Sequence, residues 1–193
     1  MLLSSSLANF TLSLVPTQLL TWIAFGTGKN FMNIHINAIC NDLGRDKSMS
    51  LPIFHSFTGC DTTSAFWGKG KKSAWEAWKS YPEVTQAFLY MARHPHASIT
   101  VETQHIKLLE RFTVIVYYKA SNQESVNEAK RELFCQNKKT MEKIPPTQDV
   151  LLRHRKRVAY QAGIWTNSDL AWLDIGQRKQ FMGSCMDHTT TGL

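Results

Sequence analysis

The sequence predicts a mostly α fold with a small β element at its N-terminal end. From residue 71 onward, apolar residues recur at helical spacing in one segment after another. Before residue 37, two short apolar segments have the alternation and the glycine boundaries of strands. A length of 193 residues and a hydrophobic fraction of 43% are sufficient for one domain with its own core.

The N-terminal part is expected to hold two strands and two short helices. An apolar segment with Trp22 and Ile23 at its centre is typical of a buried strand, and the next segment alternates apolar and polar residues. Helical spacing follows and stops at Gly44, and Pro52 suits the first turn of another short helix. The predicted bounds are 19–25 and 31–36 for the strands, and 35–43 and 52–57 for the helices.

The C-terminal part is expected to be helical after a loop at residues 58–70. Each helical segment has a stripe of apolar residues with a period near 3.6, as at Ile106 and Phe112. Trp75 and Trp78 lie on one face and are expected in the core rather than in a base-stacking platform. The predicted helices span residues 71–80, 82–92, 103–118, 125–135 and 147–162.

The net charge, the cysteines and the chain ends indicate which binding partners and which cellular compartment to expect. The formal net charge of +7 favours polyanionic partners, and we expect nucleic acid rather than a membrane. Four cysteines without CxxC spacing indicate reduced thiols in an intracellular protein, nuclear or cytoplasmic. Residues 1–18 are expected to be irregular, without a secretory signal or a membrane span, and residues 166–193 to form a frayed tail.

One segment, LPIFHSFTGCDTTSAFWGKGKK at residues 51–72, carries the residues for a chemical function. A short apolar helix ends in Gly-Cys-Asp, which would project the Asp61 carboxylate from a buried wall. Gly68 and Gly70 permit a sharp turn before a helix whose free amides and lysines can bind phosphate. The alternatives are an ordinary tight turn at the glycines and a helix cap or turn at Asp61. The order of these pieces is more informative than any one of them.

This order resembles that of the flap endonucleases and related PIN-like nucleases. In that class an apolar helix ends in Gly-[Ser/Cys]-Asp, and a loop leads to a Gly-x-Gly hairpin and a helix, the helix–two-turn–helix element. The resemblance covers residues 19–165, with that element at about 51–92 and a helical extension at about 100–165. The chain is also similar to animal PIN-like proteins found in multicopy, transposon-like settings. This similarity lies in the runs LTWIAFGTGKNF, LPIFHSFTGCDTTSAFWGKGKKSAW, LLERF, SVNEAKRELF, PPTQ and AYQAGIW.

The resemblance implies roles for individual residues. Asp61 would help to hold Mg²⁺ or Mn²⁺, and His55 would lie beside that metal, although a half-buried structural histidine is the alternative. Gly68 and Gly70 would form the hairpin that grips the DNA backbone, with K⁺ bound at the hairpin. Positive charge for this grip would come from Lys69, Lys71 and Lys72.

The acidic residues depart from the pattern of that class. A two-metal site needs several carboxylates, and in the class most of them precede the strand that corresponds to residues 19–25. Here no acidic residue precedes Asp42. We therefore expect an incomplete PIN-like α/β domain, truncated or decayed, with no confident catalytic residue and no catalysis by this chain alone.

A second basic segment, Arg153-His154-Arg155-Lys156-Arg157, lies on the predicted helix 147–162. Most such runs are solvated faces, but we expect Arg153, Arg155 and Lys156 to share a DNA-facing surface with the lysines. The sequence thus predicts the remnant of a divalent-metal-dependent, structure-specific nuclease that still binds DNA. The alternatives are a non-enzymatic helical module that binds nucleic acid or a partner, and a degenerate product without selected function.

Overall fold

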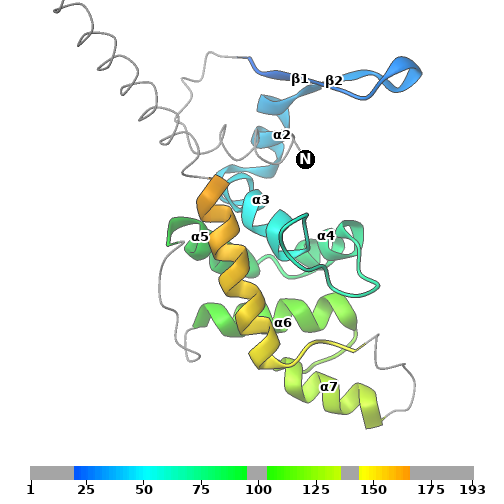
Figure 1. Cartoon of the computed structure of the whole chain (residues 1–193), viewed down its shortest axis with the longest axis vertical. Helices are drawn as coiled ribbons and strands as arrows, with labels where there is room; N and C mark the ends of the chain where they lie inside the picture. The colour runs from blue at the N-terminus through cyan, green and yellow to red at the C-terminus, as the bar shows by residue number, and fades with distance from the viewer. Residues whose placement is uncertain (1–19, 95–103, 136–143, 166–193) are drawn as a thin grey trace, which may run out of the picture.

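The computed structural model describes residues 20–94, 104–135 and 144–165. Within these ranges the fold is mostly helical with a small two-stranded sheet near the N-terminus, as predicted (Figure 1). The predicted irregular segment 1–18 and tail 166–193 lie outside the described residues. The elements are β1 (Trp22–Phe25), η1 (Gly28–Asn30), β2 (Met32–His35), α2 (Ile36–Leu43), α3 (Arg45–Phe57), α4 (Lys71–Ser80), α5 (Val84–Arg93), α6 (Gln104–Tyr117), α7 (Val126–Cys135) and an unlabelled helix at 148–165.

β1 and β2 form an antiparallel hairpin that projects away from the helices (Figure 1). Trp22 stacks on His35 across the hairpin, with ring centroids 4.3 Å apart. The chain turns at Gly26, where φ is +88° and a Cβ atom would clash with the backbone of the turn. The strand is present, but its predicted burial is wrong, because Trp22 and Phe25 are 56% and 49% exposed. No second layer of the described elements covers this sheet.

Gly44 separates α2 from α3 with φ +76°, so it ends the first helix as predicted. α3 begins at Arg45, and the predicted helix start at Pro52 is wrong. The proline lies inside α3, where its missing N–H removes one helical hydrogen bond. Burial of Pro52, Ile53 and Phe57 compensates for this cost.

α3, α5 and α6 pack around an aromatic core. Phe57, Phe88 and Phe112 are each 0% exposed, and the Phe57 ring centroid lies 5.8 Å from that of Phe88 and 6.0 Å from that of Phe112. Trp78 on α4 is also fully buried, as predicted, whereas Trp75 is half-buried against the core. The apolar stripes of α5 and α6 face inward, as their helical spacing predicts, and their buried residues include Val84, Phe88, Met91, Ile106, Leu109, Phe112, Ile115 and Val116.

The helix at residues 148–165 packs against the C-terminal end of α3. Its Leu151 and Val158 are buried, and the His154 Nε2–H donates to the Phe57 carbonyl oxygen at 2.9 Å. Burial lowers the pKa of His154, so this imidazole is neutral at pH 7. This contact brings the basic segment of the helix beside the loop at residues 58–70.

Candidate nucleic-acid interface

The loop at residues 58–70 begins with a turn that requires glycine. Gly59 has φ +100°, and a Cβ atom there would lie 2.6 Å from the Cα atom of Ala65. The Thr63 hydroxyl donates to the Ser56 carbonyl oxygen at 2.6 Å, which ties the turn back to α3. Asp61 lies at the outer side of this turn and is exposed.

Asp61 does not belong to a metal site formed by the described residues. Within residues 20–94, 104–135 and 144–165, no three His, Cys, Asp or Glu side chains form a group that could hold a metal ion. Mg²⁺ and Mn²⁺ in nucleases are bound by oxygen ligands that include several carboxylates. The described residues alone therefore do not fit the Mg²⁺ or Mn²⁺ centre that the resemblance implies.

His55, which the sequence placed beside that metal, is half-buried in the last turn of α3. Its ring centroid lies 5.8 Å from that of Trp165. Burial, and then the Lys71 ammonium, lower the pKa of His55 against a smaller opposite effect of Asp61. The structure thus gives His55 the geometry of a neutral packed side chain.

Lys71 directs its ammonium group toward the C-terminal end of α3. Its Nζ atom donates to the carbonyl oxygens of His55 (2.9 Å) and Gly59 (2.6 Å) and to the Thr58 hydroxyl (3.0 Å). Such a cation is stabilising because the last carbonyls of a helix lack helical partners. Burial lowers the pKa of Lys71, and Cys60 opposes this effect. Lys71 is therefore bonded within the protein, whereas the sequence placed it against DNA.

These three oxygen atoms also bear on the K⁺ ion that the resemblance implies at the hairpin. Carbonyl and hydroxyl oxygens are the ligands that K⁺ takes in proteins. Here they surround the ammonium of Lys71. K⁺ does not fit at these three oxygens, because the Lys71 ammonium already lies there. K⁺ at the hairpin of Gly68 and Gly70 stays a prediction.

Replacing Lys71 by methionine is expected to lower the free energy of unfolding by about 1–2 kcal/mol. This value is at the lower end of the range for hydrogen bonds to charged groups, because the ammonium is partly exposed. Methionine keeps the apolar stem but leaves the three oxygens without this donor. Lys72→Met is the control, with an expected change below about 0.5 kcal/mol, since Lys72 is exposed. Urea unfolding measures both variants, and equal losses would contradict the capping role of Lys71.

Lys69 has a similar role at another helix end. Its Nζ atom donates to the Tyr117 carbonyl oxygen at 3.2 Å and lies 5.5 Å from the centroid of the Tyr117 ring. Tyr117 is the last residue of α6, so Lys69 binds the negative end of that helix dipole. Together, Lys69 and Lys71 fix the glycine-rich end of the loop to two helices.

Gly68 and Gly70 leave open space before the first turn of α4. Gly68 has φ +63°, a conformation that favours glycine. Gly70 has φ −85°, which any residue adopts. At both positions, apart from the adjoining residues of the chain, no protein atom lies within 4 Å of an added Cβ atom. The fold therefore does not require glycine at position 70, and a ligand can approach the backbone there.

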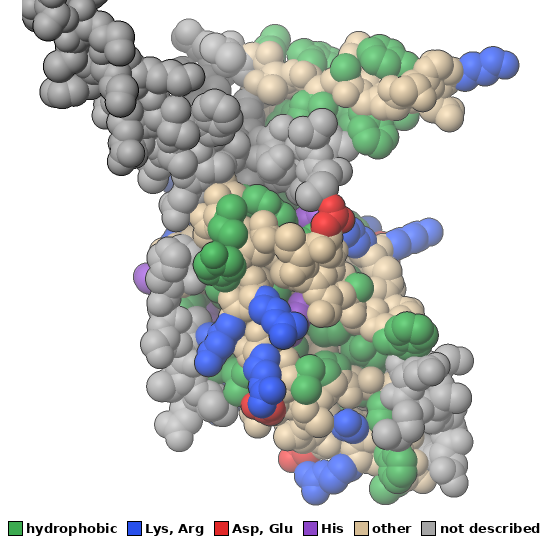
Figure 2. All heavy atoms as spheres, viewed as in Figure 1, with side chains coloured by type: hydrophobic (Ala, Val, Ile, Leu, Met, Phe, Trp, Pro, Cys, Tyr) green, Lys and Arg blue, Asp and Glu red, His purple; other side chains and the backbone are tan. Residues whose placement is uncertain are grey.

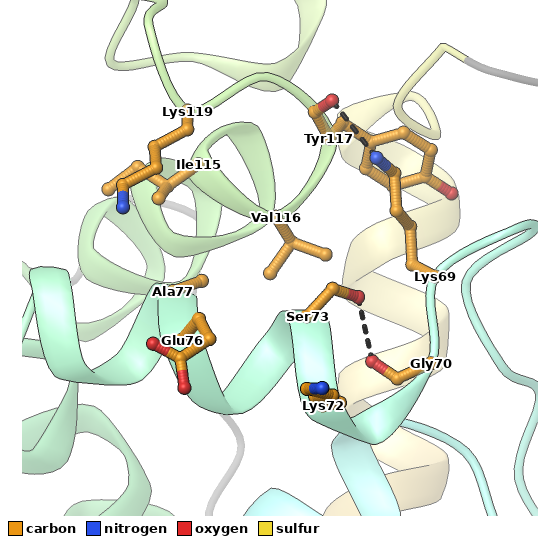
Figure 3. A pocket seen from close by; sticks show the side chains of 10 residues that line it. All are labelled: Lys69, Gly70, Lys72, Ser73, Glu76, Ala77, Ile115, Val116, Tyr117 and Lys119. Atoms are coloured by element: carbon orange, nitrogen blue, oxygen red, sulfur yellow. Dashed lines mark hydrogen bonds between the residues drawn. The ribbon is translucent and has the colours of Figure 1, made fainter.

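A groove of about 610 Å³ lies between the first turns of α4 and the last turn of α6 (Figure 3). Lys72 lines it from α4, and Lys119 lines it from the turn that follows α6. Both lysines are exposed, and no described residue is bonded to either ammonium. Glu76 also lines the groove, but Lys79 binds its carboxylate at 3.1 Å. The full lining is Lys69, Gly70, Lys72, Ser73, Glu76, Ala77, Ile115, Val116, Tyr117 and Lys119.

The helix at residues 148–165 carries a basic surface, where Lys and Arg side chains gather (Figure 2). Arg153, Lys156 and Arg157 are exposed, and Arg153 binds Asp149 at 2.8 Å. Arg155 is 3% exposed, and the prediction that it faces DNA is wrong. Two residues along a helix correspond to a rotation of about 200°, which turns Arg155 inward when Arg153 points outward.

A smaller pocket of about 330 Å³ lies beside the basic surface and shares Tyr117 with the groove. Tyr117 borders both hollows, and the apolar side chains of Phe66 and Leu151 line the smaller one. Arg153 and Arg157 line it as well. Positive charge therefore continues from the groove, past Tyr117, to the helix at residues 148–165.

No family model, no curated protein and no solved structure matches this chain. The resemblance to flap endonucleases and PIN-like proteins therefore stays a prediction. Among the described residues, no helix is both long and apolar enough to cross a membrane. Function is inferred below from the geometry of these side chains.

Proposed function

We propose that this chain binds the phosphate backbone of nucleic acid, without reading its sequence, in the groove between α4 and α6. The proposal rests on the open space before Gly70, where the first turn of α4 meets a groove lined by Lys72 and Lys119. Helix N-terminal amides and lysines bind phosphates without regard to base identity. The net charge of +7 agrees with such a partner.

Neighbouring contacts support this proposal. The ion pair between Lys79 and Glu76 reduces the repulsion that a free carboxylate in the groove would exert on phosphate. Lys69 and Lys71 act indirectly, since their hydrogen bonds to α6 and α3 hold the end of the loop in place. The backbone at Gly70 is thereby positioned before any ligand arrives, which reduces the entropy lost on binding.

A nuclease remnant is the second candidate, supported by the order of the Gly-Cys-Asp and Gly-Lys-Gly-Lys-Lys motifs. Hydrolysis through two metal ions requires carboxylates in addition to Asp61. Cleavage of a DNA flap in Mg²⁺, abolished by Asp61→Asn, would favour this candidate. Binding in EDTA that is equal in the wild type and Asp61→Asn, without cleavage in Mg²⁺, would favour the binding module.

Gly70 offers a direct test of the groove. Gly70→Ala and Gly70→Val are compatible with φ −85° and are expected to change the free energy of unfolding by less than about 1 kcal/mol. Their side chains would stand before the α4 amides, so affinity for nucleic acid should fall progressively, by about tenfold for valine. Fluorescence anisotropy with labelled duplex and single-stranded DNA measures this at several salt concentrations. Wild-type affinity in both folded variants would show that phosphate does not approach Gly70.

A further inference from the structure

Arg155 carries a buried positive charge whose donors lack acceptors. The side chain is 3% exposed, and its Nε and Nη1 atoms are buried without any hydrogen-bond partner. A guanidinium removed from water and left unpaired is strongly destabilising. Buried polar groups in native proteins are nearly always bonded to protein atoms, ordered water or an ion. The described residues offer no acceptor to these two donors, so water or a bound anion must supply one.

Tyr90 of α5 and His105 of α6 interact electrostatically with this guanidinium. The Tyr90 ring stacks with His94 at 4.5 Å and with His105 at 4.1 Å between centroids. One ring face cannot hold two stacked partners, so the two imidazoles lie on opposite faces of Tyr90. Burial, and then the charges of His94 and Arg155, lower the pKa of His105.

The charges of this cluster are all of one sign. Burial lowers the pKa of Arg155, and the group that opposes this effect is the Tyr90 hydroxyl rather than a carboxylate of the described residues. His105 likewise is acted on by His94 and Arg155, with no described carboxylate opposing them. A cluster with such an excess of cationic and donor groups attracts an anion.

We propose that Arg155, Tyr90 and His105 form a binding site for a small oxyanion of the phosphate or sulfate class. Its oxygens would accept hydrogen bonds from the guanidinium, with the Tyr90 hydroxyl or an imidazole N–H as a further donor. A nucleic-acid backbone cannot reach a side chain that is 3% exposed. The site is therefore separate from the groove between α4 and α6 and does not rest on the proposed function.

Thermal unfolding with inorganic phosphate tests the site in the full chain, at constant ionic strength and against a buffer free of oxyanions. Saturating phosphate is expected to raise the Tm of the wild type by about 3 °C or more. Arg155→Met should show no rise, because methionine removes the buried cation and keeps its apolar contacts. Arg131→Met on α7 is the control, since Arg131 is exposed and lines neither hollow, and it should respond like the wild type. No rise in the wild type, or an equal rise in Arg155→Met, overturns the proposal.

A second measurement needs no variant and decides the case if Arg155→Met fails to fold. The imidazole resonances of the wild type are titrated with acid, in phosphate and in sodium chloride of equal ionic strength. A bound oxyanion favours the protonated imidazole, so phosphate should raise the pKa of His105. The same His105 titration in both salts would indicate screening alone and would also overturn the proposal.

Discussion

Replacing Phe57 by alanine is expected to lower the free energy of unfolding by about 3–5 kcal/mol. The ring is 0% exposed and lies 5.3 Å from the rings of Phe66 and His154 and 6.0 Å from that of Phe112. These partners belong to the loop at residues 58–70, the helix at 148–165 and α6. Alanine would leave a cavity where all three meet α3, so the loss should be a large part of the stability of the fold. Urea unfolding followed by circular dichroism measures it.

The matched control is Phe134→Ala on α7. Phe134 is 62% exposed, so its removal is expected to change the free energy of unfolding by less than about 1 kcal/mol. Both variants delete the same atoms, and only Phe57→Ala leaves a buried cavity. Similar losses in the two variants would mean that the loop and the helix at residues 148–165 do not pack on Phe57.

The helices were predictable because their apolar residues must repeat with the helical period to reach one core. α4 has the predicted bounds 71–80, and α5, α6 and α7 begin and end within two residues of their predictions. The start of α3 was predicted wrongly at Pro52. A proline marks a helix start only when tertiary packing does not compensate for the lost hydrogen bond. For the hairpin, the predicted burial of the first strand was wrong for a different reason. Its apolar composition is that of a buried strand, but the described residues provide no layer to cover Trp22 or Phe25.

The candidate site was predictable in position but not in the use of its charges. Local sequence indicates that glycines and lysines precede α4, and the structure places the groove there. Local sequence does not indicate that Lys69 binds the end of α6, because the acceptor, Tyr117, is 48 residues away in the chain. Lys119 was missed for the same reason: it faces the groove only after α6 has packed beside α4. A basic run also cannot reveal that Arg155 points inward while Arg153 and Lys156 point outward.

Replacing Lys72 and Lys119 together by alanine is expected to weaken nucleic-acid binding by about tenfold at about 50 mM salt. The slope of log affinity against log salt should become shallower by about 2, because two fewer phosphates are neutralised and fewer counterions are released. Both side chains are exposed, so the free energy of unfolding should stay within about 0.5 kcal/mol of the wild type. Anisotropy titrations with labelled DNA over a series of salt concentrations give both quantities.

A double variant that removes the same charge elsewhere separates the groove from net charge. Lys107 on α6 and Arg131 on α7 are exposed and do not line the groove, and their replacement by alanine also removes two positive charges. If attraction to the overall charge of +7 governs binding, the two double variants should lose affinity and salt dependence equally. If phosphates lie between α4 and α6, the loss should be confined to Lys72→Ala/Lys119→Ala. Equal losses would therefore reject the groove as the binding site, even though the chain would still bind DNA.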